Sequence, residues 1–425
     1  MRLCGRDRLF VRPESVLKSL LSARLRSLSA LLFACTALTA QSAHAGSLSE
    51  AEALARAAAL PELAALDTAT GDAARADAKT VRRYENPEFH VGRERISGSL
   101  GTETEQTAGV TQPLGINGAN GRLREAAEAE EQAVNADIVR RKAMRLSEVR
   151  KAYSECGASA ERAVILGDLN AGLTEVERII SLRTRAGDAA GYDLRRVRLE
   201  ARNVAAQKVL ADGEVRAACA ALSRMTGEPN ARASEPLFAL LRPARPALEG
   251  LASRSDLDAQ RYRVTAAGAQ AEAARRQRLP DLSVGAGYKR VSQGGLSSSG
   301  PTISLGIRLP LFNRGAAAAS AAEARKRAAE AELALAKSAI AAERDAAFAR
   351  AEASFEAARL AQDSAEDARR IADIADAAYQ GGETGITELI DGYRAGAEAR
   401  TSAIDLAERA LKARADHLLA DEGEE

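Results

Sequence analysis

Large aromatic side chains are scarce in this sequence of 425 residues. It has no tryptophan, and aromatic residues make up only 3% of it. A large globular core depends on such side chains, so the composition argues against one. Alanine-rich helices can approach one another closely, as they do in a coiled coil. The composition therefore predicts long packed helices.

An excess of charge of one sign is also absent. The chain has 60 basic and 59 acidic residues, a net charge of +1. Its first 45 residues hold seven basic and two acidic residues, a surplus of five, so the rest has a net charge of 1 − 5 = −4. Nucleic-acid binding requires a basic stripe, and we therefore expect no nucleic-acid partner.

Residues with the chemistry of a metal or catalytic site are few. Beyond residue 45 the histidines are His90 and His417, far apart in sequence. No cluster of cysteine, histidine and carboxylate has metal-site spacing. The glycine-rich stretch 115–121 is followed by no Lys-Ser/Thr, so a strand-to-helix turn explains it better than a phosphate loop. We expect no metal site, no cofactor and no enzymatic activity.

The apolar run near the start of the chain, Leu28–Leu38, is too short to cross a bilayer as a helix. Basic residues precede it, and it leads to Ala43-His44-Ala45, a small-x-small cleavage pattern. Residues 1–45 are therefore interpreted as an export signal. Cys35 follows Leu32-Phe33-Ala34, a poor lipid-attachment box. Lipidation of Cys35 is weighed against the alternative that this cysteine is discarded with the leader.

The stretch 279–393 has the clearest organisation. Two short strands, about 280–291 and 301–312, flank a Gly/Ser loop at 293–300. From Gly315 to about Tyr379 there is neither proline nor further glycine, which predicts one uninterrupted helix. Its roughly 65 residues would extend about 100 Å. The helix ends at a glycine-rich turn, 381–385, and a return helix, about 386–418, follows.

The same plan occurs earlier in the chain. Strands are expected at about 86–97 and 104–114, a long helix at about 119–184, a glycine-rich turn at 187–191 and a return helix at about 192–225. The offset of about 193–197 residues indicates an internal duplication. The expected domains are a first repeat 46–225, a linker 226–255 and a second repeat 256–420, followed by an acidic tail 421–425. Four prolines, at positions 229, 236, 243 and 246, prevent the linker from continuing a coiled coil.

The strands have one apolar and one polar or small face. In the later hairpin Ile303, Leu305, Ile307, Leu309 and Leu311 oppose Ser304, Gly306 and Arg308; in the earlier one Ala108, Val110 and Leu114 oppose Thr107, Gly109 and Thr111. This pattern is typical of a membrane strand, and also of the edge of a soluble sandwich. Four strands cannot close a barrel, so copies must be combined: three give twelve strands and a channel, and two give eight strands and a filled interior. A sparse aromatic girdle would contain Tyr84, Phe89, Tyr288 and Phe312.

Apolar residues at helical spacing predict an antiparallel coiled-coil hairpin at the end of each repeat. In the first, the seam is Leu166, Leu169, Leu173, Val176 and Ile180. In the second, two rows compete: Leu360, Ile371, Ile374 and Ala378, which Ser364 and Asp367 interrupt, and the uninterrupted row Ala361, Ala365, Ala368, Ala372 and Ala375.

Two cysteines, Cys156 and Cys219, lie about 32 residues before and about 31 after Asp188 in the first turn. A hairpin folded at that turn would place them at the same height, and export would place them in an oxidising compartment. We predict a disulfide; the alternative is two buried thiols with different neighbours.

The paired strand starts, Asn86-Pro87-Glu88-Phe89 and Leu279-Pro280-Asp281-Leu282, and the strand ends Gln112-Pro113-Leu114 and Leu309-Pro310-Leu311 resemble those of the TolC family of outer-membrane efflux channels. The first start and the strand Gly109–Leu114 are most similar to the heavy-metal subgroup, of the cobalt-zinc-cadmium type. The resemblance implies a mainly α homotrimer with a small β part: a twelve-stranded barrel in the outer-membrane lipid of a Gram-negative bacterium and a helical tunnel across the periplasm. It also implies a periplasmic adaptor and an inner-membrane RND pump as partners, and heavy-metal cations or other toxic small molecules as cargo.

The resemblance also implies roles for particular residues. Those at the turns, which would meet the adaptor, are Gly187, Gly191, Leu194, Gly381, Gly385 and Leu389. Those nearest to the family's polar periplasmic gate are Tyr379, Asp391, Tyr393 and Arg394, for each of which an ordinary exposed helix position is the alternative. The linker 226–255 would form a belt around the middle of the tunnel. The rival function is a periplasmic adaptor or other coiled-coil linker protein, which explains the helices and the leader but not the two strand hairpins.

Overall fold

The structure is a computed structural model that describes residues 46–81, 84–99, 101–188, 190–245 and 254–422. The leader with Cys35, residues 246–253 of the linker and residues 423–425 of the tail lie outside the described residues. The chain divides into two units, Met1–Ser47 and Leu48–Glu425; apart from Ser47, the first residue of β1, the features discussed below lie in the second.

Long helices dominate the second unit. In chain order the elements are β1 (Ser47–Leu48), α2 (Glu50–Ala58), α3 (Pro61–Val81), β2 (Glu88–Gly98), β3 (Gly101–Pro113), α4 (Ala119–Ala186), α5 (Gly191–Thr226), β4 (Arg232–Ala233), α6 (Leu237–Leu240), α7 (Ser255–Arg276), β5 (Asp281–Gln293), β6 (Leu296–Arg308), α8 (Ala316–Gly381) and α9 (Ile386–Asp421). Helices α4 and α8 have 68 and 66 residues. None of the helices in the described part is long and apolar enough to cross a membrane.

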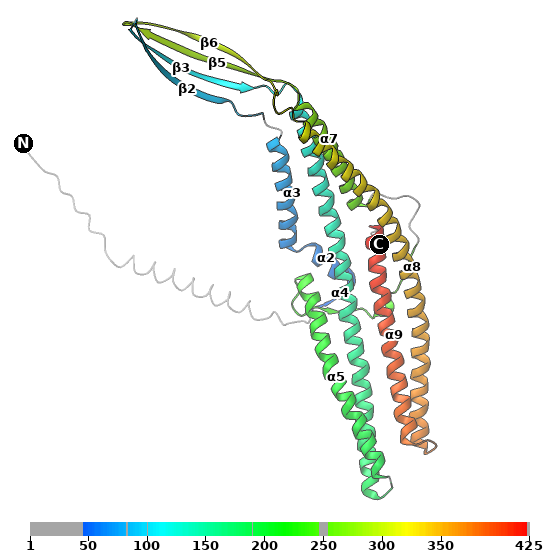
Figure 1. Cartoon of the computed structure of the whole chain (residues 1–425). Helices are drawn as coiled ribbons and strands as arrows, with labels where there is room; N and C mark the ends of the chain where they lie inside the picture. The colour runs from blue at the N-terminus through cyan, green and yellow to red at the C-terminus, as the bar shows by residue number, and fades with distance from the viewer. Residues whose placement is uncertain (1–45, 82–83, 100, 189, 246–253, 423–425) are drawn as a thin grey trace, which may run out of the picture. The chain divides into compact units, whose positions relative to one another are not determined.

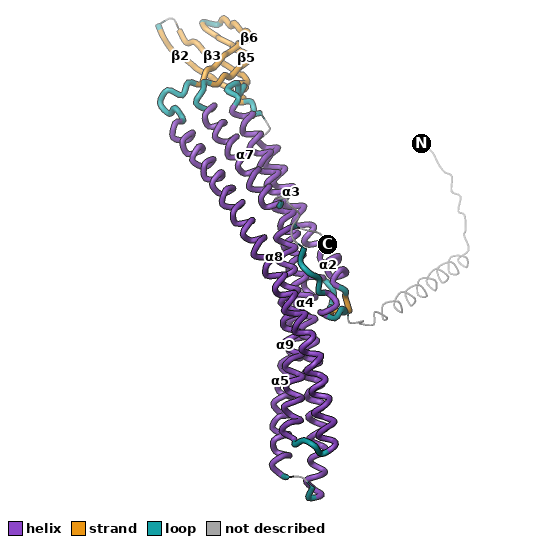
Figure 2. The backbone as a smooth tube through the Cα atoms, turned by 90° about the vertical axis from the view of Figure 1, so that its right-hand side faces the viewer, coloured by secondary structure: helices purple, strands orange, loops and turns teal. Residues whose placement is uncertain are grey.

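The helices pack side by side along most of their length. On the side toward the sheet, α4 packs against α3 and α7, and α7 packs against α8. On the side toward the turns, α4 packs against α5 and α9, and α8 packs against α9. The sheet therefore lies at one end of this unit and the two turns lie at the other, as Figures 1 and 2 show.

The four long strands form one antiparallel sheet in the order β2-β3-β5-β6. Gly294 and Gly295 make the two-residue turn between β5 and β6, with φ of +56° and +85°, a conformation that glycine adopts readily. The segment 293–300, expected to be a loop, is therefore mostly strand. Strand β6 ends at Arg308, so Leu309 and Leu311, expected within the strand, follow it. Strands β2 and β6 are the two edges of this sheet.

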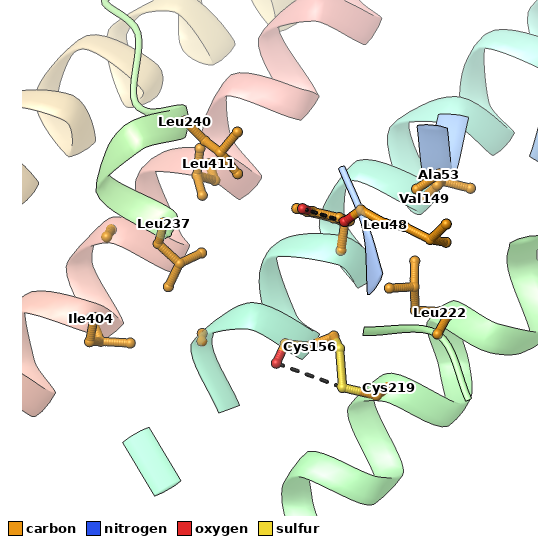
Figure 3. Packing of buried hydrophobic residues seen from close by; sticks show 14 of the residues in the cluster. Leu48, Ala53, Val149, Cys156, Cys219, Leu222, Leu237, Leu240, Ile404 and Leu411 are labelled. Atoms are coloured by element: carbon orange, nitrogen blue, oxygen red, sulfur yellow. Dashed lines mark hydrogen bonds between the residues drawn. A yellow bond between two sulfur atoms is a disulfide. The ribbon is translucent and has the colours of Figure 1, made fainter. Parts of the chain in front are cut away.

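The larger apolar core of the unit surrounds the middle of α4 and of α9. Figure 3 shows part of its packing. A disulfide joins Cys156 of α4 to Cys219 of α5, with 4.7 Å between their Cα atoms. Tyr153, only 1% exposed, donates a hydrogen bond of 2.8 Å from its hydroxyl to the carbonyl of Leu48. That hydroxyl accepts a bond of 3.2 Å from the backbone N–H of Ser234 in the linker. The linker is thereby fixed against α4 by satisfied polar groups as well as by apolar contacts.

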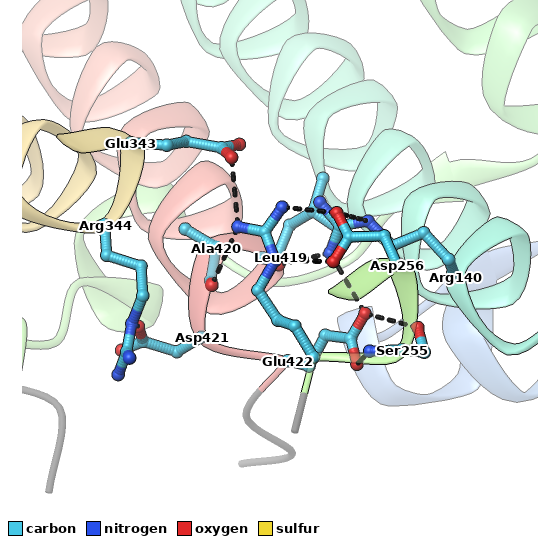
Figure 4. Close-up of polar contacts among 10 residues, drawn as sticks. Arg140, Ser255, Asp256, Glu343, Arg344, Leu419, Ala420, Asp421 and Glu422 are labelled. Carbon is cyan, nitrogen blue, oxygen red and sulfur yellow. Dashed lines mark hydrogen bonds and ion pairs between the residues drawn. The ribbon is translucent and has the colours of Figure 1, made fainter. Parts of the chain in front are cut away.

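A network of charges, which we call the C-terminal clasp, fixes the end of α9 (Figure 4). Arg254, 5% exposed, donates to Asp256 at 2.6 Å, to Glu343 of α8 at 3.0 Å and to the carbonyl of Ala420 at 3.2 Å. Arg140 of α4 donates to the carbonyl of Leu419 at 2.8 Å. Burial raises the pKa of Asp256, but Arg254 and Arg140 outweigh this and hold that pKa below its ordinary value. The clasp joins α4, α7, α8 and α9 at one height.

Candidate functional site

The sheet exposes its apolar face, and on its two central strands the polar face is the less accessible one. Residues opposite one another across the strands share a face, and the apolar face carries Phe89 and Val91 of β2, Ala108 and Val110 of β3, Leu282, Val284, Ala286 and Tyr288 of β5, and Ile303, Leu305 and Ile307 of β6. On this face Ile303 is 91% exposed and Val91 is 70% exposed. Monomeric soluble proteins rarely expose so large a continuous apolar surface to water. The face therefore requires a covering that the described residues do not provide.

The opposite face is lined by glycine and hydroxyl side chains. Away from the hairpin turns, this face includes His90 and Gly92 of β2, Thr107, Gly109 and Thr111 of β3, Ser283, Gly285 and Gly287 of β5, and Thr302, Ser304 and Gly306 of β6. On the central strands, Gly109 and Gly285 are buried although their apolar-face neighbours Val110 and Val284 are exposed. A sheet whose polar side is the less accessible one suits lipid outside and water inside.

The expected aromatic girdle lies partly on this surface. Phe89 and Tyr288 lie on the apolar face of the sheet, 71% and 55% exposed. Tyr84 precedes β2 and Phe312 follows β6, and they are 71% and 100% exposed. The aromatic residues thus lie both on the sheet and beside its helix-proximal end.

The two turns at the far end of the helices close in the same way. At the first, the backbone N–H of Gly187 donates to the carbonyl of Thr184 at 3.2 Å, and that of Asp188 donates to the carbonyl of Arg183 at 2.8 Å. At the second, Gly382 N–H bonds to Tyr379 at 3.1 Å and Glu383 N–H bonds to Ala378 at 2.9 Å. Both pairs satisfy carbonyls that the ends of α4 and α8 leave free.

Glycine is required at fewer turn positions than the sequence suggests. Gly187 has φ of +88° and Gly382 has φ of +78°, both in the left-handed region. Gly191 is the first residue of α5, Gly381 is the last residue of α8, and Gly385 caps α9 with extended backbone. The backbone angles at these three positions therefore do not require glycine. The left-handed residue of the second turn is Gly382.

A second apolar cluster, which we call the turn-end core, lies next to the turns. It is formed by Leu173, Val176 and Ile180 of α4, Val197, Ala201 and Val204 of α5, and Ile386, Leu389 and Ile390 of α9. Leu389 is fully buried, and Leu194, Tyr379 and Tyr393 pack against the cluster. From Leu169 to Ile180 the first predicted seam is thus a packed interface, and three helices rather than two contribute to it; Leu166 is not part of this cluster.

The contact between α8 and α9 uses small residues. A Cβ added to Gly392 would lie 2.7 Å from the Cβ of Ala375, and one added to Gly396 would lie 3.2 Å from the Cβ of Ala372. The alanine row therefore forms the close contact. The competing row is exposed: Leu360 is 60%, Ile371 56% and Ile374 67% accessible.

Tyr393 makes the polar link between the two helices of this pair. Its hydroxyl donates a hydrogen bond of 2.7 Å to Asp376. Gly172 of α4 makes room for the ring, since a Cβ there would lie 3.2 Å from it. Burial raises the pKa of Tyr393, and the carboxylates of Asp376 and Asp373 raise that pKa further. The phenol therefore keeps its proton. The stability that its hydrogen bond to Asp376 contributes is lost only as the pH rises through the raised pKa of Tyr393.

The other gate candidates differ in their surroundings. Arg394 forms an ion pair of 3.0 Å with Glu200 of α5. Asp391 is exposed and has no polar partner among the described residues. Tyr379 is half-buried beside the turn-end core. The structure thus places Tyr393 and Arg394 in links between helices, but not Asp391.

The sequence interpretation missed the partners Asp376 and Glu200. Asp376 and Tyr393 flank the turn at 382–385 at nearly equal distances along the chain, as Cys156 and Cys219 flank the first turn. The reasoning that predicted the disulfide would have found this hydrogen bond too. Glu200 has no such signal, because it lies on the hairpin of the other half of the chain.

In the described part of the chain, no group of three or more His, Cys, Asp and Glu side chains could hold a metal ion. His90 is exposed on β2. His417 is 5% exposed and its Nε2 lies 2.9 Å from the carbonyl of Arg245.

Comparisons with known proteins agree with this architecture. The family model described as "Outer membrane efflux protein" matches residues 249–417. The CmeC outer membrane channel of Campylobacter jejuni has a TM-score of 0.73 and 16% identity, covering 88% of this chain and 85% of that one. CusC has a TM-score of 0.76 and 18% identity, covering 88% and 92%. The open state of the MtrE outer membrane channel of Neisseria gonorrhoeae has a TM-score of 0.72 and 17% identity, covering 91% and 93%. These likenesses show a shared fold. No curated protein matches the sequence.

Proposed function

Through residues 249–417 the chain belongs to the outer membrane efflux protein family, and from this premise we propose that three copies of it form one closed channel. The chain is an outer-membrane channel of a tripartite efflux system rather than an enzyme. Its partners in such a system are an adaptor and a pump. What the proposal adds is the assembly, its moving parts and its cargo.

The observation that carries the assembly is the exposed apolar face of an open sheet. Each copy has four strands with unpaired edges at β2 and β6. Joining β6 of one copy to β2 of the next removes every edge and turns all apolar faces to lipid. Three copies supply twelve strands and a water-filled interior lined by the glycine and hydroxyl face. Two copies would supply eight strands, and their side chains would fill the interior.

We also propose that the chain arose by internal duplication. The order of two strands, long helix, left-handed glycine turn and return helix occurs in β2-β3-α4-α5 and again in β5-β6-α8-α9. The matching pairs of hydrogen bonds at Gly187 and Gly382 support it further. Each half would then supply one hairpin of strands and one helical hairpin to the channel.

We assign adaptor docking to the turn ends and gating to the α8–α9 pair. The docking residues are Gly187, Gly191, Leu194, Gly381 and Gly385. Leu389, also expected there, is fully buried in the turn-end core and would support the turn from inside rather than touch the adaptor. The hydrogen bond from Tyr393 to Asp376 and the ion pair of Arg394 with Glu200 would hold the periplasmic entrance closed. The contact of Gly392 and Gly396 with alanines lets α9 slide past α8 without moving large side chains.

The proposed cargo is heavy-metal cations. It rests on the likeness of Asn86-Pro87-Glu88-Phe89 and of the strand Gly109–Leu114 to the cobalt-zinc-cadmium subgroup. A conduit needs no tight metal site, because ions must leave it readily. Growth of a deletion strain on zinc, cobalt, cadmium and a set of drugs tests this cargo. Sensitivity to drugs without sensitivity to metals would remove it.

The assembly is tested by isolating the protein in detergent. We expect outer-membrane fractionation, a trimer by cross-linking and ion conductance in planar bilayers. Arg394→Ala should raise the conductance by breaking a helix-to-helix link, whereas Asp391→Ala should leave it unchanged. A water-soluble monomer would refute the assembly and favour a coiled-coil adaptor. Equal conductance of both variants and wild type would refute only the gate.

A further inference from the structure

On the exposed face of the sheet, apolar side chains give way to arginines toward the hairpin turns. Along β2, Arg93 and Arg95 follow Phe89 and Val91 at alternate positions. Along β5, Arg290 follows Tyr288 in the same way. Because side chains alternate between the faces of a strand, all three arginines share the face that carries the apolar residues.

The sheet register brings these arginines together. Arg93 lies opposite Gln106, which lies opposite Arg290, so these two arginines occupy one row across three strands. At about 4.8 Å between strands they are roughly 10 Å apart. Arg95 lies one step closer to the turn, opposite Thr104. We call these three residues the arginine row.

Among the described residues, the arginine row has no acidic partner. All three side chains are exposed, and no ion pair joins them to a carboxylate of the described residues. The neighbouring Glu94, Glu103 and Glu105 point to the opposite face, where Glu105 pairs with Lys289 at 2.6 Å. The row is therefore a group of cations at the upper border of a lipid-covered surface.

Tyr288 marks where that border lies. It is the aromatic side chain of β5 that directly precedes Arg290 on this face, and its hydroxyl is hydrogen-bonded to Ser299 at 3.0 Å. A tyrosine with its ring in an apolar region and its hydroxyl satisfied is typical of the membrane–water interface. The helices lie in the periplasm, so the hairpin turns and the arginine row lie at the outer leaflet.

We propose that Arg93, Arg95 and Arg290 bind the phosphate groups of an anionic phosphorylated lipid of the outer leaflet. The planar guanidinium donates two parallel hydrogen bonds to a phosphate, and such charge-assisted bonds are strong where water is partly excluded. The apolar face immediately below the row accommodates the acyl chains. This inference rests on the proposed trimeric barrel.

The test measures lipid retention by native mass spectrometry of the purified trimer titrated with diphosphorylated lipid A. The variant Arg93→Gln plus Arg290→Gln removes two cations from the lipid face. Its matched control, Lys289→Gln plus Arg308→Gln, removes two cations from the polar face. At about 1 kcal/mol for each basic residue near an anionic surface, we expect binding to fall on the order of thirtyfold in the first variant and to be unchanged in the control. Arg93→Lys plus Arg290→Lys should retain intermediate binding.

The outcomes separate this inference from the function on which it rests. Equal lipid retention by both double variants, with trimers and conductance intact, would overturn the lipid site and leave the channel standing. Displacement of the lipid by equimolar inorganic phosphate would show only a general anion site and would also overturn it. Loss of trimer and conductance in the wild type would refute the channel and the lipid site together.

Discussion

The close contact between α8 and α9 predicts that the same substitution, glycine to alanine, destabilises the protein at that contact and stabilises it elsewhere. Gly392→Ala and Gly396→Ala each add one methyl group to α9 where it faces α8. Gly268→Ala adds the same group to α7 at a position with no heavy atom within 4 Å of the new Cβ. All three changes replace glycine within a helix, so the intrinsic gain from alanine, about 1 kcal/mol, is common to them.

The packing term differs between the three positions. At Gly392 the new Cβ would lie 2.7 Å from the Cβ of Ala375, whereas carbon atoms pack at about 3.5–4.0 Å. The helices must separate by about 1 Å, at a cost of about 1–3 kcal/mol. At Gly396 the distance is 3.2 Å and a shift of a few tenths of an ångström is enough. We expect Gly268→Ala to stabilise the protein by about 1 kcal/mol, Gly396→Ala to be nearly neutral and Gly392→Ala to destabilise it by about 1 kcal/mol.

Thermal unfolding of the detergent-solubilised protein, followed by circular dichroism at one fixed heating rate, measures this order. A fixed rate is needed because large membrane assemblies often unfold irreversibly. Conductance of the same samples adds a second readout, since separation of α8 from α9 should lengthen the bond from Tyr393 to Asp376. If Gly392→Ala were as stable as Gly268→Ala, the close approach of these helices would be refuted.

Three further changes test other parts of the structure. Cys156→Ser plus Cys219→Ser should lower the free energy of unfolding by at most about 4 kcal/mol, because the disulfide closes a loop over a separation of 63 residues. Wild-type protein treated with reductant should unfold at the same midpoint as this variant. An unchanged midpoint in the variant would contradict the bridge. Tyr393→Phe should raise the conductance and lower the free energy of unfolding by about 1 kcal/mol. Asp376→Asn, which keeps a hydrogen-bond acceptor, should change both quantities less. Equal conductance of the two variants and the wild type would exclude the bond from Tyr393 to Asp376 from the gate. Arg254→Met should lower the free energy of unfolding by about 3 kcal/mol, because it leaves the carboxylates of the C-terminal clasp without their buried partner. A loss below about 1 kcal/mol would show that the clasp contributes little to stability.

The sequence predicted the features that depend on local pattern and on distance from a turn. Helices α4 and α8 follow from long stretches without proline. The bridge from Cys156 to Cys219 follows from their nearly equal distances to Asp188. The pattern could not decide which row of α8 is packed, because Leu360 and Ile371 favour one row on hydrophobicity alone. Gly392 and Gly396, four residues apart on the partner helix, carried the missing information: only small residues fit opposite them.

Other features depend on contacts that no local pattern reports. The C-terminal clasp joins Arg140 to Glu422 across 282 residues. The segment 293–300 was misinterpreted for a different reason. Its serines and glycines are typical of loops, yet Gly294-Gly295 is the dipeptide of a two-residue hairpin turn, which extends both strands. A tight turn should have outweighed composition there.

The open edges of the sheet have a consequence for the life of the protein before it reaches its destination. A newly exported copy has unpaired backbone groups on β2 and β6 beside an apolar surface, a combination that attracts any extended peptide. If the proposed trimer forms, the chain is therefore most prone to aggregate in the interval between export and assembly with the other two copies. The yield of functional channel should therefore depend on how well apolar residues such as Phe89 and Ile303 are kept from water before the protein reaches the membrane.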